Sequence, residues 1–515
     1  MTVSSGADRR IPLALYYIKA YFEKKCAHKT PRVKVSINSF SSADTVDAII
    51  NKILAEKPDI LGLSCYAWNI KKILDVAGII KKKKPLIKII LGGPEVSPRA
   101  REILKKEVSI DIVVRGEGEE AFSRLMESFI YGKIGLQSIP GISYRGAKKI
   151  VTNSRMPLLE NMDLIPSPYL SGLIDIKNVS EVPYETMRGC PFRCHFCYEH
   201  KDYDKIRFFS LGRVAGDLKF ILSRKPPSMF IFDSTFNADP QRAKDVLRLF
   251  IKYNKVTKLR LAIKAELLDE EMIELMSRAG VYVLEVGIQT INARTLKTVN
   301  RTMQKNIFKK NIRLLRLKRV PFELQLVALL PHDTYESLKR SVDWVCDLHP
   351  SGVAIYNFTV LPGTYLRQHA KTYGIKYRRA APYCAYQSNA VSQEDCKKIV
   401  QLRSALDTCY NSGAIRKTLY AVKSKLGVPF SRFFEDWSRW ERAFCNSHKR
   451  LFRGKLNADR LDELVRAAPE FLFSLCGRYK RPSVYDSLYR ILRVDIMNFI
   501  AALEVLKHKK GVVID

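Results

Sequence analysis

The amino-acid sequence predicts an α/β fold in which two successive regions of alternating strands and helices precede a mainly α-helical region. Three observations along the 515-residue chain support this prediction. Short β-branched runs alternate with amphipathic helical patterns over about residues 12–145, the alternation returns over about 181–360, and it stops after 361. We therefore expect four segments, which cover residues 1–150, 151–180 (a linker), 181–370 and 371–515.

In the first region, strand patterns alternate with helical patterns. Strands are predicted at 33–38, 60–65, 87–93 and 111–116, and helices at 45–57, 70–84 and 119–132. Such alternation indicates a parallel, doubly wound sheet, in which ligands bind beyond the carboxyl ends of the strands. Those ends carry the sequences SCYAWN, GGPEVS and RGEGEE, whose glycines let a backbone approach a bulky ligand. No apolar strand precedes the sequence IPLALYYIKAYF, so we expect either that the sequence begins late or that the sheet lacks one strand.

The order of IPLALYYIKAYF, DILGLSCYAWN, IILGGPEVS and DIVVRGEGEEAF resembles the Rossmann-like cobalamin-binding domain that precedes many radical S-adenosylmethionine (SAM) enzymes. A D-x-H-x-x-G motif is missing, and His28 is the only histidine before residue 195, so we expect a bound cobalt to lack a histidine ligand on its lower face. The resemblance implies that the strand-end loops surround the corrin ring. The candidate cobalamin-binding residues are Ser64, Tyr66, Trp68, Gly92, Gly93, Pro94, Glu95, Arg115, Gly116, Gly118 and Glu119.

The sequence MRGCPFRCHFCYEH at residues 187–200 holds three cysteines with C-x3-C-x2-C spacing, in the loop after a predicted strand at 182–189. A four-iron cluster is held by thiolates, and three thiolates leave one iron open to a further ligand. A closed zinc site would need a fourth ligand, for which His195 or His200 is available. The candidate metal ligands are Cys190, Cys194 and Cys197.

This cysteine spacing, with Phe196 before the last cysteine, resembles the signature of the radical SAM superfamily. The resemblance implies a [4Fe-4S] cluster that binds SAM and generates a 5′-deoxyadenosyl radical. It also implies a six-stranded (βα)6 partial TIM barrel, with strands at 182–189, 228–234, 258–265, 281–289, 322–330 and 352–360. The strand ends supply the candidate SAM-binding residues, which are Phe196, Asp233, Ser234, Lys264, Glu266, Glu285, Gly287 and Gln289. The charged members of this set are equally well interpreted as salt bridges at the barrel rim.

After residue 371 the sequence pattern predicts mainly helices. An apolar stripe advances by three or four residues and is interpreted as core; it comprises Leu488, Leu492, Ile496, Phe499, Leu503 and Leu506. The sequences LPGT, PYCAYQSN and YNSG within residues 361–413 resemble the tail of a subgroup of cobalamin-type radical enzymes of unestablished substrate. We expect the region after 371 to cap the barrel mouth.

Composition narrows the range of partners and locations. The formal net charge of +36 is spread along the whole chain and forms no basic arm, so a nucleic-acid partner is not favoured. No apolar run is long enough to predict a transmembrane segment, and the first residues lack a secretory signal, so we expect a cytoplasmic protein. Eleven cysteines in so long a chain are too dilute for a disulfide framework.

Together the resemblances imply a cobalamin-dependent radical SAM enzyme with three cofactors: a [4Fe-4S] cluster, SAM and cobalamin. The leading reaction is methylation of an unactivated carbon of a small molecule or natural product, with a flavodoxin- or ferredoxin-like electron donor. The alternatives are a non-methylating radical reaction (cyclisation, ring contraction or oxidation) and a non-catalytic cobalamin or iron–sulfur sensor. Transfer-RNA methylthiolation is disfavoured because such relatives carry three more cysteines in the amino-terminal domain, where this chain has only Cys26 and Cys65. No residue is assigned as catalytic.

Overall fold

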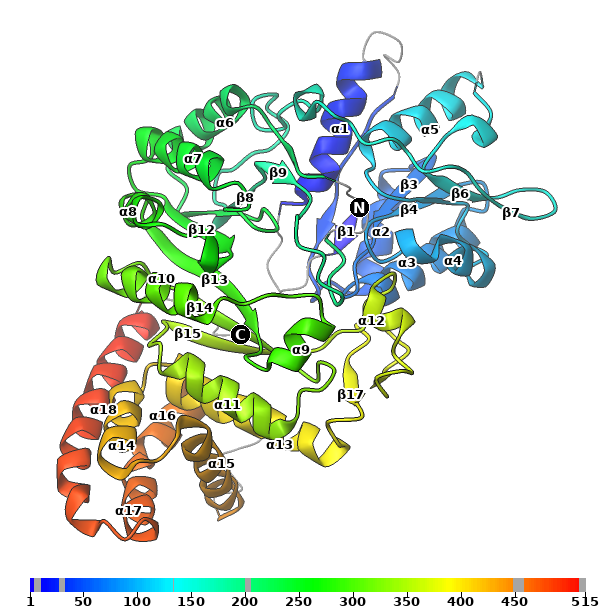
Figure 1. The fold of residues 1–515 in the computed structure, drawn as a ribbon. Coiled ribbons are helices and arrows are strands. Elements are labelled where there is room, and N and C mark those ends of the chain that lie inside the picture. Colours follow the sequence, from blue (N-terminus) through cyan, green and yellow to red (C-terminus); the bar gives the residue numbers. More distant parts are fainter. Residues whose placement is uncertain (4–10, 27–32, 133, 200–204, 448–457, 509–515) are drawn as a thin grey trace.

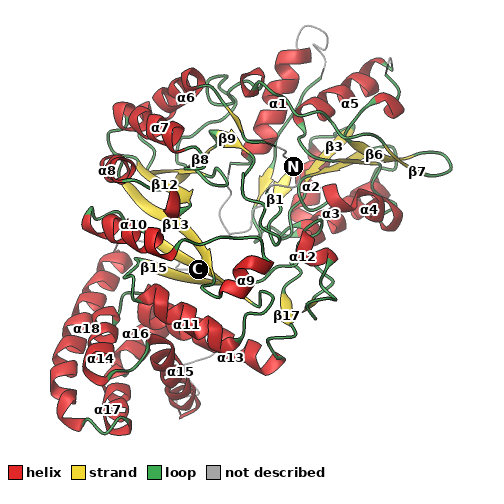
Figure 2. Ribbon diagram, in the orientation of Figure 1, coloured by secondary structure: helices red, strands yellow, loops and turns green. Residues whose placement is uncertain are grey.

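The computed structural model describes residues 1–3, 11–26, 33–132, 134–199, 205–447 and 458–508. Two sheets of mainly parallel strands lie side by side, and a group of helices extends from the second (Figure 1). The α/β class and the mainly helical carboxyl-terminal region predicted from the sequence are confirmed (Figure 2).

The amino-terminal sheet has five strands. Three are parallel neighbours, as predicted, and two continue the sheet as an antiparallel hairpin that the sequence analysis missed. In order they are β3 (Ile60–Ser64), β4 (Lys88–Gly92), β5 (Ile112–Val114), β6 (Ile142–Arg145) and β7 (Ile150–Thr152).

Helices cover both faces of this sheet. On one face Ile89 and Leu91 pack against α2 (Val46–Ala55), α3 (Ile70–Lys83) and α4 (Ala100–Lys106). On the other face Ile90 and Ile112 pack against α1 (Leu13–Cys26) and α5 (Glu119–Tyr131). Because alternate strand residues point to opposite faces, this division confirms the doubly wound arrangement.

Two expectations about the first strands are wrong. The strand predicted at 33–38 is irregular, and the neighbouring strand is instead β2 (Ser39–Phe40), which pairs with β1 (Thr2–Val3). Lys19 Nζ donates to the Val35 carbonyl oxygen at 2.7 Å, so a side chain takes an acceptor that a strand partner would need. The edge beside β3 is also not vacant, because the Met1 amine donates to the Gly62 carbonyl at 2.7 Å and Met1 accepts from the Ser64 N–H at 2.8 Å. His28 lies outside the described residues.

The second sheet has six parallel strands in chain order, as expected of the partial barrel. They are β8 (Glu181–Tyr184), β11 (Ser228–Ile231), β12 (Lys258–Ile263), β13 (Val281–Gln289), β14 (Glu323–Ala328) and β15 (Gly352–Asn357). The outer face is covered by α6 (Leu211–Ser223), α7 (Pro240–Tyr253), α8 (Glu270–Arg278), α10 (Lys305–Leu317) and α11 (Tyr335–Cys346). The predicted cysteine strand is divided into β8 and a short β9 (Met187–Arg188), which pairs with β10 (Arg207–Phe208).

After β15 come α12 (Tyr365–Gln368), β16 (Lys376–Tyr377) and β17 (Ala385–Gln387), followed by helices. The helices are α13 (Gln393–Leu406), α14 (Arg416–Leu426), α15 (Phe430–Ser447), α16 (Ala458–Arg466), α17 (Ala468–Arg478) and α18 (Tyr485–His508). In the predicted stripe on α18, Leu488, Leu492 and Phe499 are buried, which confirms them as core. The side chains of Leu503 and Leu506 lie outside the described part of the structure. In the described residues, no helix combines the length and apolarity that a membrane crossing requires.

The carboxyl-terminal region contacts the rest of the molecule in two places. Its helices pack against the side of the barrel, where α13 and α15 contact α11. The stretch 361–389 instead reaches the cysteine loop and the first sheet. There a Cβ at Gly363, which has φ +80°, would lie 2.8 Å from Pro98 and 3.2 Å from Tyr198. This stretch therefore lies against the cysteine loop and the first sheet, while the larger helices flank the barrel.

Candidate functional site

The three cysteines of the signature lie in the loop that follows β9, after Gly189 at φ +96°. All three thiols are free of disulfides, and Cys194 is buried. The Cys190 sulfur lies 3.7 Å from Thr235 Oγ1, and the Cys197 sulfur accepts from the Glu199 N–H at 3.4 Å. Burial, opposed in part by hydrogen bonds, raises the pKa of Cys190, and burial raises the pKa of Cys197 to about 12. A raised pKa favours the neutral thiol form of Cys190 and Cys197, and a bound metal centre would oppose it, since a coordinating thiol is deprotonated.

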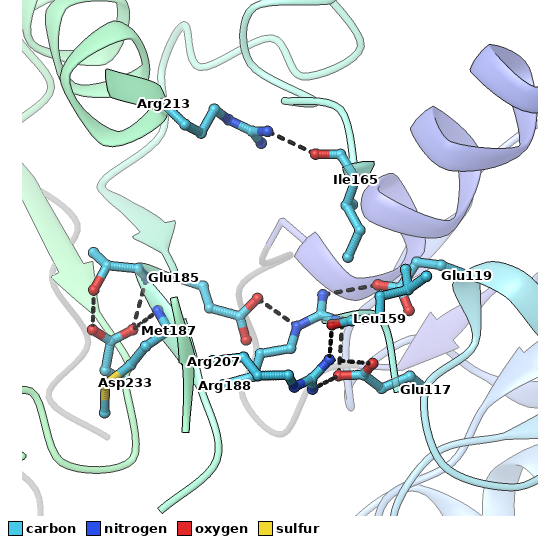
Figure 3. Close-up of polar contacts among 11 residues, drawn as sticks. Glu117, Glu119, Leu159, Ile165, Glu185, Met187, Arg188, Arg207, Arg213 and Asp233 are labelled. Carbon is cyan, nitrogen blue, oxygen red and sulfur yellow. Dashed lines mark hydrogen bonds and ion pairs between the residues drawn. The ribbon is translucent and has the colours of Figure 1, made fainter. Parts of the chain in front are cut away.

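The strand that leads into the cysteine loop is held by Asp233, one of the predicted SAM-binding residues. Its carboxylate accepts from the Thr186 N–H at 2.8 Å, from the Thr186 hydroxyl at 2.5 Å and from the Met187 N–H at 3.2 Å (Figure 3). Burial raises the pKa of Asp233 to about 6, and the contacts to Thr186 and Met187 limit the rise. Asp233 thus positions the backbone before the cysteines.

His195, the alternative fourth metal ligand, is engaged elsewhere. Its Nδ1 lies 2.8 Å from the Thr298 carbonyl oxygen at the end of α9 (Ala293–Thr298), and its ring lies 4.0 Å from that of Tyr365 in α12. His200 lies outside the described residues. Among the residues described, no three His, Cys, Asp or Glu side chains are grouped to bind one metal ion. Three cysteine thiols in one loop are the ligand set that an iron–sulfur cluster with one open iron needs.

A cavity of about 300 Å³ opens beside Cys194. Three cationic residues line it: Arg193, Arg301 and Lys264. Arg301 Nη1 lies 3.9 Å from the Cys194 sulfur, and Lys264 Nζ lies 4.4 Å from the centre of the Phe192 ring. Burial, together with the Arg301 charge and against the nearby acidic groups, lowers the pKa of Lys264. The cavity therefore presents positive charge next to a cysteine of the signature.

The other predicted SAM-binding residues are dispersed. Glu285 accepts from Arg260 Nε at 2.8 Å, and Arg260 Nη1 also lies 3.5 Å from Glu181, so Glu285 belongs to an ion pair on the inner face of the barrel. Ser234 donates to Glu199 at 2.9 Å. Gly287 and Gln289 end β13, where Gln289 has φ +68° and a Cβ at Gly287 would lie 2.5 Å from Gln289 Nε2. Phe196 packs against the barrel core, and Glu266 lies in the turn after Lys264.

The predicted cobalamin loops meet at one edge, since they follow the neighbouring parallel strands β3, β4 and β5. Part of this edge is open. The Tyr66 and Trp68 rings stack at 4.4 Å with Trp68 57% exposed, Pro94 is exposed, and a Cβ at Gly116 (φ +78°) would meet no atom within 4 Å. An exposed Trp68 stacked on a half-buried Tyr66, at the same sheet edge as the open Gly116, suits a flat, bulky ligand such as a corrin.

Other predicted cobalamin residues point into the protein. Arg115 Nη2 donates to the carbonyls of Ile142 at 3.4 Å and Ser154 at 3.3 Å, and Glu119 accepts from Arg188 at 2.8 Å. The buried Glu95 accepts from Arg99 and from the Tyr383 hydroxyl. Three more predicted positions, Ser64, Gly92 and Gly118, lie in the strand ends and turns, and a Cβ at Gly118 would lie 2.7 Å from Ile18.

Sequence reasoning missed several residues of the site. Arg301 follows β13 by 12 positions and has no motif, and Arg188 and Arg207 belong to a short ribbon that no periodicity reveals. Arg188 directly precedes Gly189 and Cys190 in the sequence, but nothing in the sequence indicates the distant carboxylates with which it pairs.

Three protein families match the chain. The B12 binding domain matches residues 4–126, the Radical SAM superfamily matches residues 184–345, and a family described as a protein of unknown function (DUF4080) matches residues 371–454.

Relatives with described activities share the first two families. The chain is 30% identical over 194 residues to the cobalamin-dependent radical SAM methyltransferase TokK of Streptomyces tokunonensis, a match that covers 36% of this chain and 28% of TokK. It is 24% identical over 390 residues to a 2-(S-pantetheinyl)-carbapenam-3-carboxylate methyltransferase of Streptantibioticus cattleyicolor, with 72% and 56% covered. An anaerobic magnesium-protoporphyrin IX monomethyl ester cyclase of Rubrivivax gelatinosus is 24% identical over 331 residues, with 61% and 59% covered. The matches thus span 28–59% of the relatives' own lengths.

Among solved structures, that of the cobalamin-dependent SAM radical enzyme OxsB with aqua-cobalamin and SAM bound has a TM-score of 0.66 with this chain, at 15% identity. The match covers 97% of this chain and 83% of that one, and at this identity it shows the fold.

The fold and the site define a protein in which a B12-binding domain is joined to a radical SAM partial barrel. The chain thus combines a B12 binding domain with a radical SAM domain, and its cofactors are a [4Fe-4S] cluster, SAM and cobalamin. The family and the cofactors expected from the sequence are confirmed.

Proposed function

We propose that this enzyme is a cobalamin-dependent methyltransferase that acts on an unactivated carbon of a small molecule or natural product. Two methyltransferases among its relatives support the proposal. The observation that chiefly carries it is the direct contact between the B12-domain loop 115–119 and the strand before the cysteines, through Glu119 and Arg188. Chemistry shared between two cofactors and one substrate requires all three at one place.

The proposed roles follow the geometry. Cys190, Cys194 and Cys197 would hold the cluster, and Lys264 and Arg301 beside Cys194 would attract a carboxylate group of a ligand. When bound, the cofactors supply hydrogen-atom abstraction and methyl transfer.

Gln289 is a further candidate for contact with SAM. Within the described residues its Oε1 atom is buried without a hydrogen-bond partner, and its backbone is in the left-handed region. A strained backbone and an unsatisfied acceptor at one strand end are features of ligand sites.

On the domain level, we propose that residues 1–150 bind cobalamin through the open side of the loops at 64–68, 92–95 and 115–119. Residues 181–370 would bind the cluster and SAM, joined by the linker 151–180. Residues 371–515, with the stretch that precedes them, would limit access of solvent and substrate, because Gly363 and Tyr383 contact the first sheet and the cysteine loop.

The test is product analysis under anaerobic conditions. The full chain is reconstituted with iron, sulfide and cobalamin and incubated with SAM and a strong reductant, and 5′-deoxyadenosine and S-adenosylhomocysteine are measured by mass spectrometry. We expect both products from the wild-type protein. The Cys194→Ala variant should form no 5′-deoxyadenosine but should still bind cobalamin supplied in excess, since Cys194 lies in the barrel and not in the B12 domain.

Each other outcome has a definite meaning. Cleavage of SAM by Cys194→Ala would overturn the assignment of the cluster ligands. Formation of 5′-deoxyadenosine without S-adenosylhomocysteine would favour a non-methylating reaction, as the similarity to a cyclase also allows.

A further inference from the structure

The cysteine loop lies between the two strands of a short antiparallel ribbon. Strand β9 directly precedes the cysteines and β10 follows them, and Arg188 of β9 is the direct partner of Arg207 of β10. Both arginine side chains are buried, at 8% and 2% exposure. Two guanidinium groups paired across a ribbon repel each other, so the ribbon needs carboxylates beside it.

Most of those carboxylates come from the B12 domain. Glu117 accepts from Arg188 Nη1 at 3.1 Å and from Arg207 Nη1 at 3.1 Å, so one carboxylate joins the two arginines. Glu119 accepts from Arg188 Nη2 at 2.8 Å (Figure 3). The barrel itself adds Glu185, which accepts from Arg188 Nε at 3.0 Å. Without loop 115–119 the two arginines would keep a single carboxylate among these three, and a buried charge without its partner is strongly destabilising.

Loop 115–119 has a second side. Glu117 and Glu119 face the ribbon, whereas Gly116 between Arg115 and Glu117 has open space where a side chain would stand. Gly118 packs tightly, since a Cβ there would lie 2.7 Å from Ile18 in α1. The loop thus contacts the ribbon on one side and α1 beneath it, and it leaves its open side for a ligand. A ligand that fixes this loop also fixes the two carboxylates.

We propose that the ribbon couples the two cofactor sites, with Arg188 as the positioning residue through which cobalamin at loop 115–119 and the cluster at the cysteine loop each favour binding of the other. Such coupling is reciprocal, so it is measurable as an effect of the cluster on cobalamin affinity. The inference rests on the cofactor set and not on the reaction proposed above, because no turnover is involved.

The experiment compares the affinity for hydroxocobalamin before and after cluster reconstitution, on the full chain. Spectrophotometric titration gives both dissociation constants, and their ratio reports the coupling. We expect reconstitution to tighten binding at least about fivefold in the wild-type protein, and Arg188→Met to reduce the ratio below about twofold. Glu119→Gln should reduce it as well, since it removes the charge on the other side of the contact with little change in volume.

A matched control is Arg213→Met. Arg213 is a half-buried arginine of α6 that donates to Asp217 at 2.8 Å. It also donates to the Ile165 carbonyl at 2.6 Å, away from loop 115–119 (Figure 3). The Arg213→Met variant should keep the wild-type ratio of cobalamin dissociation constants even if its free energy of unfolding is lower. The double variant Arg188→Met with Glu119→Gln should have the same ratio as Arg188→Met alone, because residues that act through one contact are not additive.

Two results would overturn the proposal. One is a wild-type ratio of one, which would mean that the sites bind independently. The other is that Glu119→Gln keeps the wild-type ratio of cobalamin dissociation constants. This second result would overturn the proposal whether or not Arg188→Met folds. Neither result would affect the product analysis, so the failure of the coupling and the failure of the proposed reaction are distinguishable.

Discussion

At the edge of the first sheet, the loop 92–95 is held largely by the fit of its own backbone, whereas the cysteine loop at the edge of the barrel is held by side chains from distant elements. In the first sheet, Gly93 stands so close to the preceding strand end that a Cβ would lie 2.5 Å from the Cys65 carbonyl oxygen. In the barrel, Asp233, Arg188 and His195 each bond to groups of other elements around the cysteines.

The difference concerns how far each site depends on the whole molecule. A glycine that fits against a neighbouring strand end requires only its own sheet to fold. A carboxylate that holds a strand, or an arginine between three carboxylates, requires the barrel and the B12 domain to be assembled. The first edge should therefore respond to changes in local backbone fit, and the second to charge and pH.

The largest effect is expected for Gly93→Val. Gly93 has φ +107°, so a β-branched side chain there is both strained and in collision with the Cys65 backbone. We expect a loss of about 3–5 kcal/mol of unfolding free energy and a loss of cobalamin binding. Urea denaturation and the corrin absorbance of the purified protein measure the two effects.

Gly62→Ala is the matched control in the same sheet, since a Cβ there meets no atom within 4 Å. It should unfold within about 1 kcal/mol of wild type. If Gly93→Val were as stable as this control, the backbone fit would not be what holds the first edge.

An intermediate effect is expected for Glu185→Gln, and it should depend on pH. Burial raises the pKa of Glu185 from 4.5 to about 7, against the attraction of Arg188. The folded protein thus binds this proton more tightly than the unfolded chain. The contribution of Glu185 to stability is fully present below about pH 4.5 and is lost as the pH rises through 7. Glutamine keeps an acceptor for Arg188 and removes the titration.

Denaturation of both proteins at pH 5 and pH 8 gives the measurement. Relative to wild type, the variant should gain up to about 3 kcal/mol on going from pH 5 to pH 8. The exposed Glu394→Gln, on the surface of α13, should leave the pH dependence as it is. An unchanged profile in Glu185→Gln would show that this carboxyl is not held in a buried charge network.

The same contrast explains what the sequence predicted and what it did not. The parallel strands, the strand-end glycines and the cysteine spacing are local patterns, and the structure has them close to the expected residues. The hairpin β6–β7 was missed because its strands are only four and three residues long. Asp233 and Glu285 were both expected at the SAM site; the sequence did not reveal that Asp233 holds the strand before the cysteines or that Glu285 is in an ion pair with Arg260. Which partner a charged side chain finds is a long-range property that no spacing encodes.

The smallest effect is expected for Tyr383→Phe, which tests the long-range contact of the loop 92–95 at the first edge. The Tyr383 hydroxyl, from the stretch before α13, donates to the buried Glu95 of the loop 92–95, and Arg99 supplies a second donor. Because Arg99 remains, the variant should lose only about 1–2 kcal/mol of unfolding free energy and keep its cobalamin affinity within about twofold. Tyr253→Phe, at the end of α7 and far from both edges in sequence, is the control for loss of a hydroxyl. A tenfold loss of cobalamin affinity in Tyr383→Phe alone would show that the carboxyl-terminal stretch also holds the first edge. Both edges would then depend on side chains from distant parts of the chain, and they would differ only in how strongly they do so.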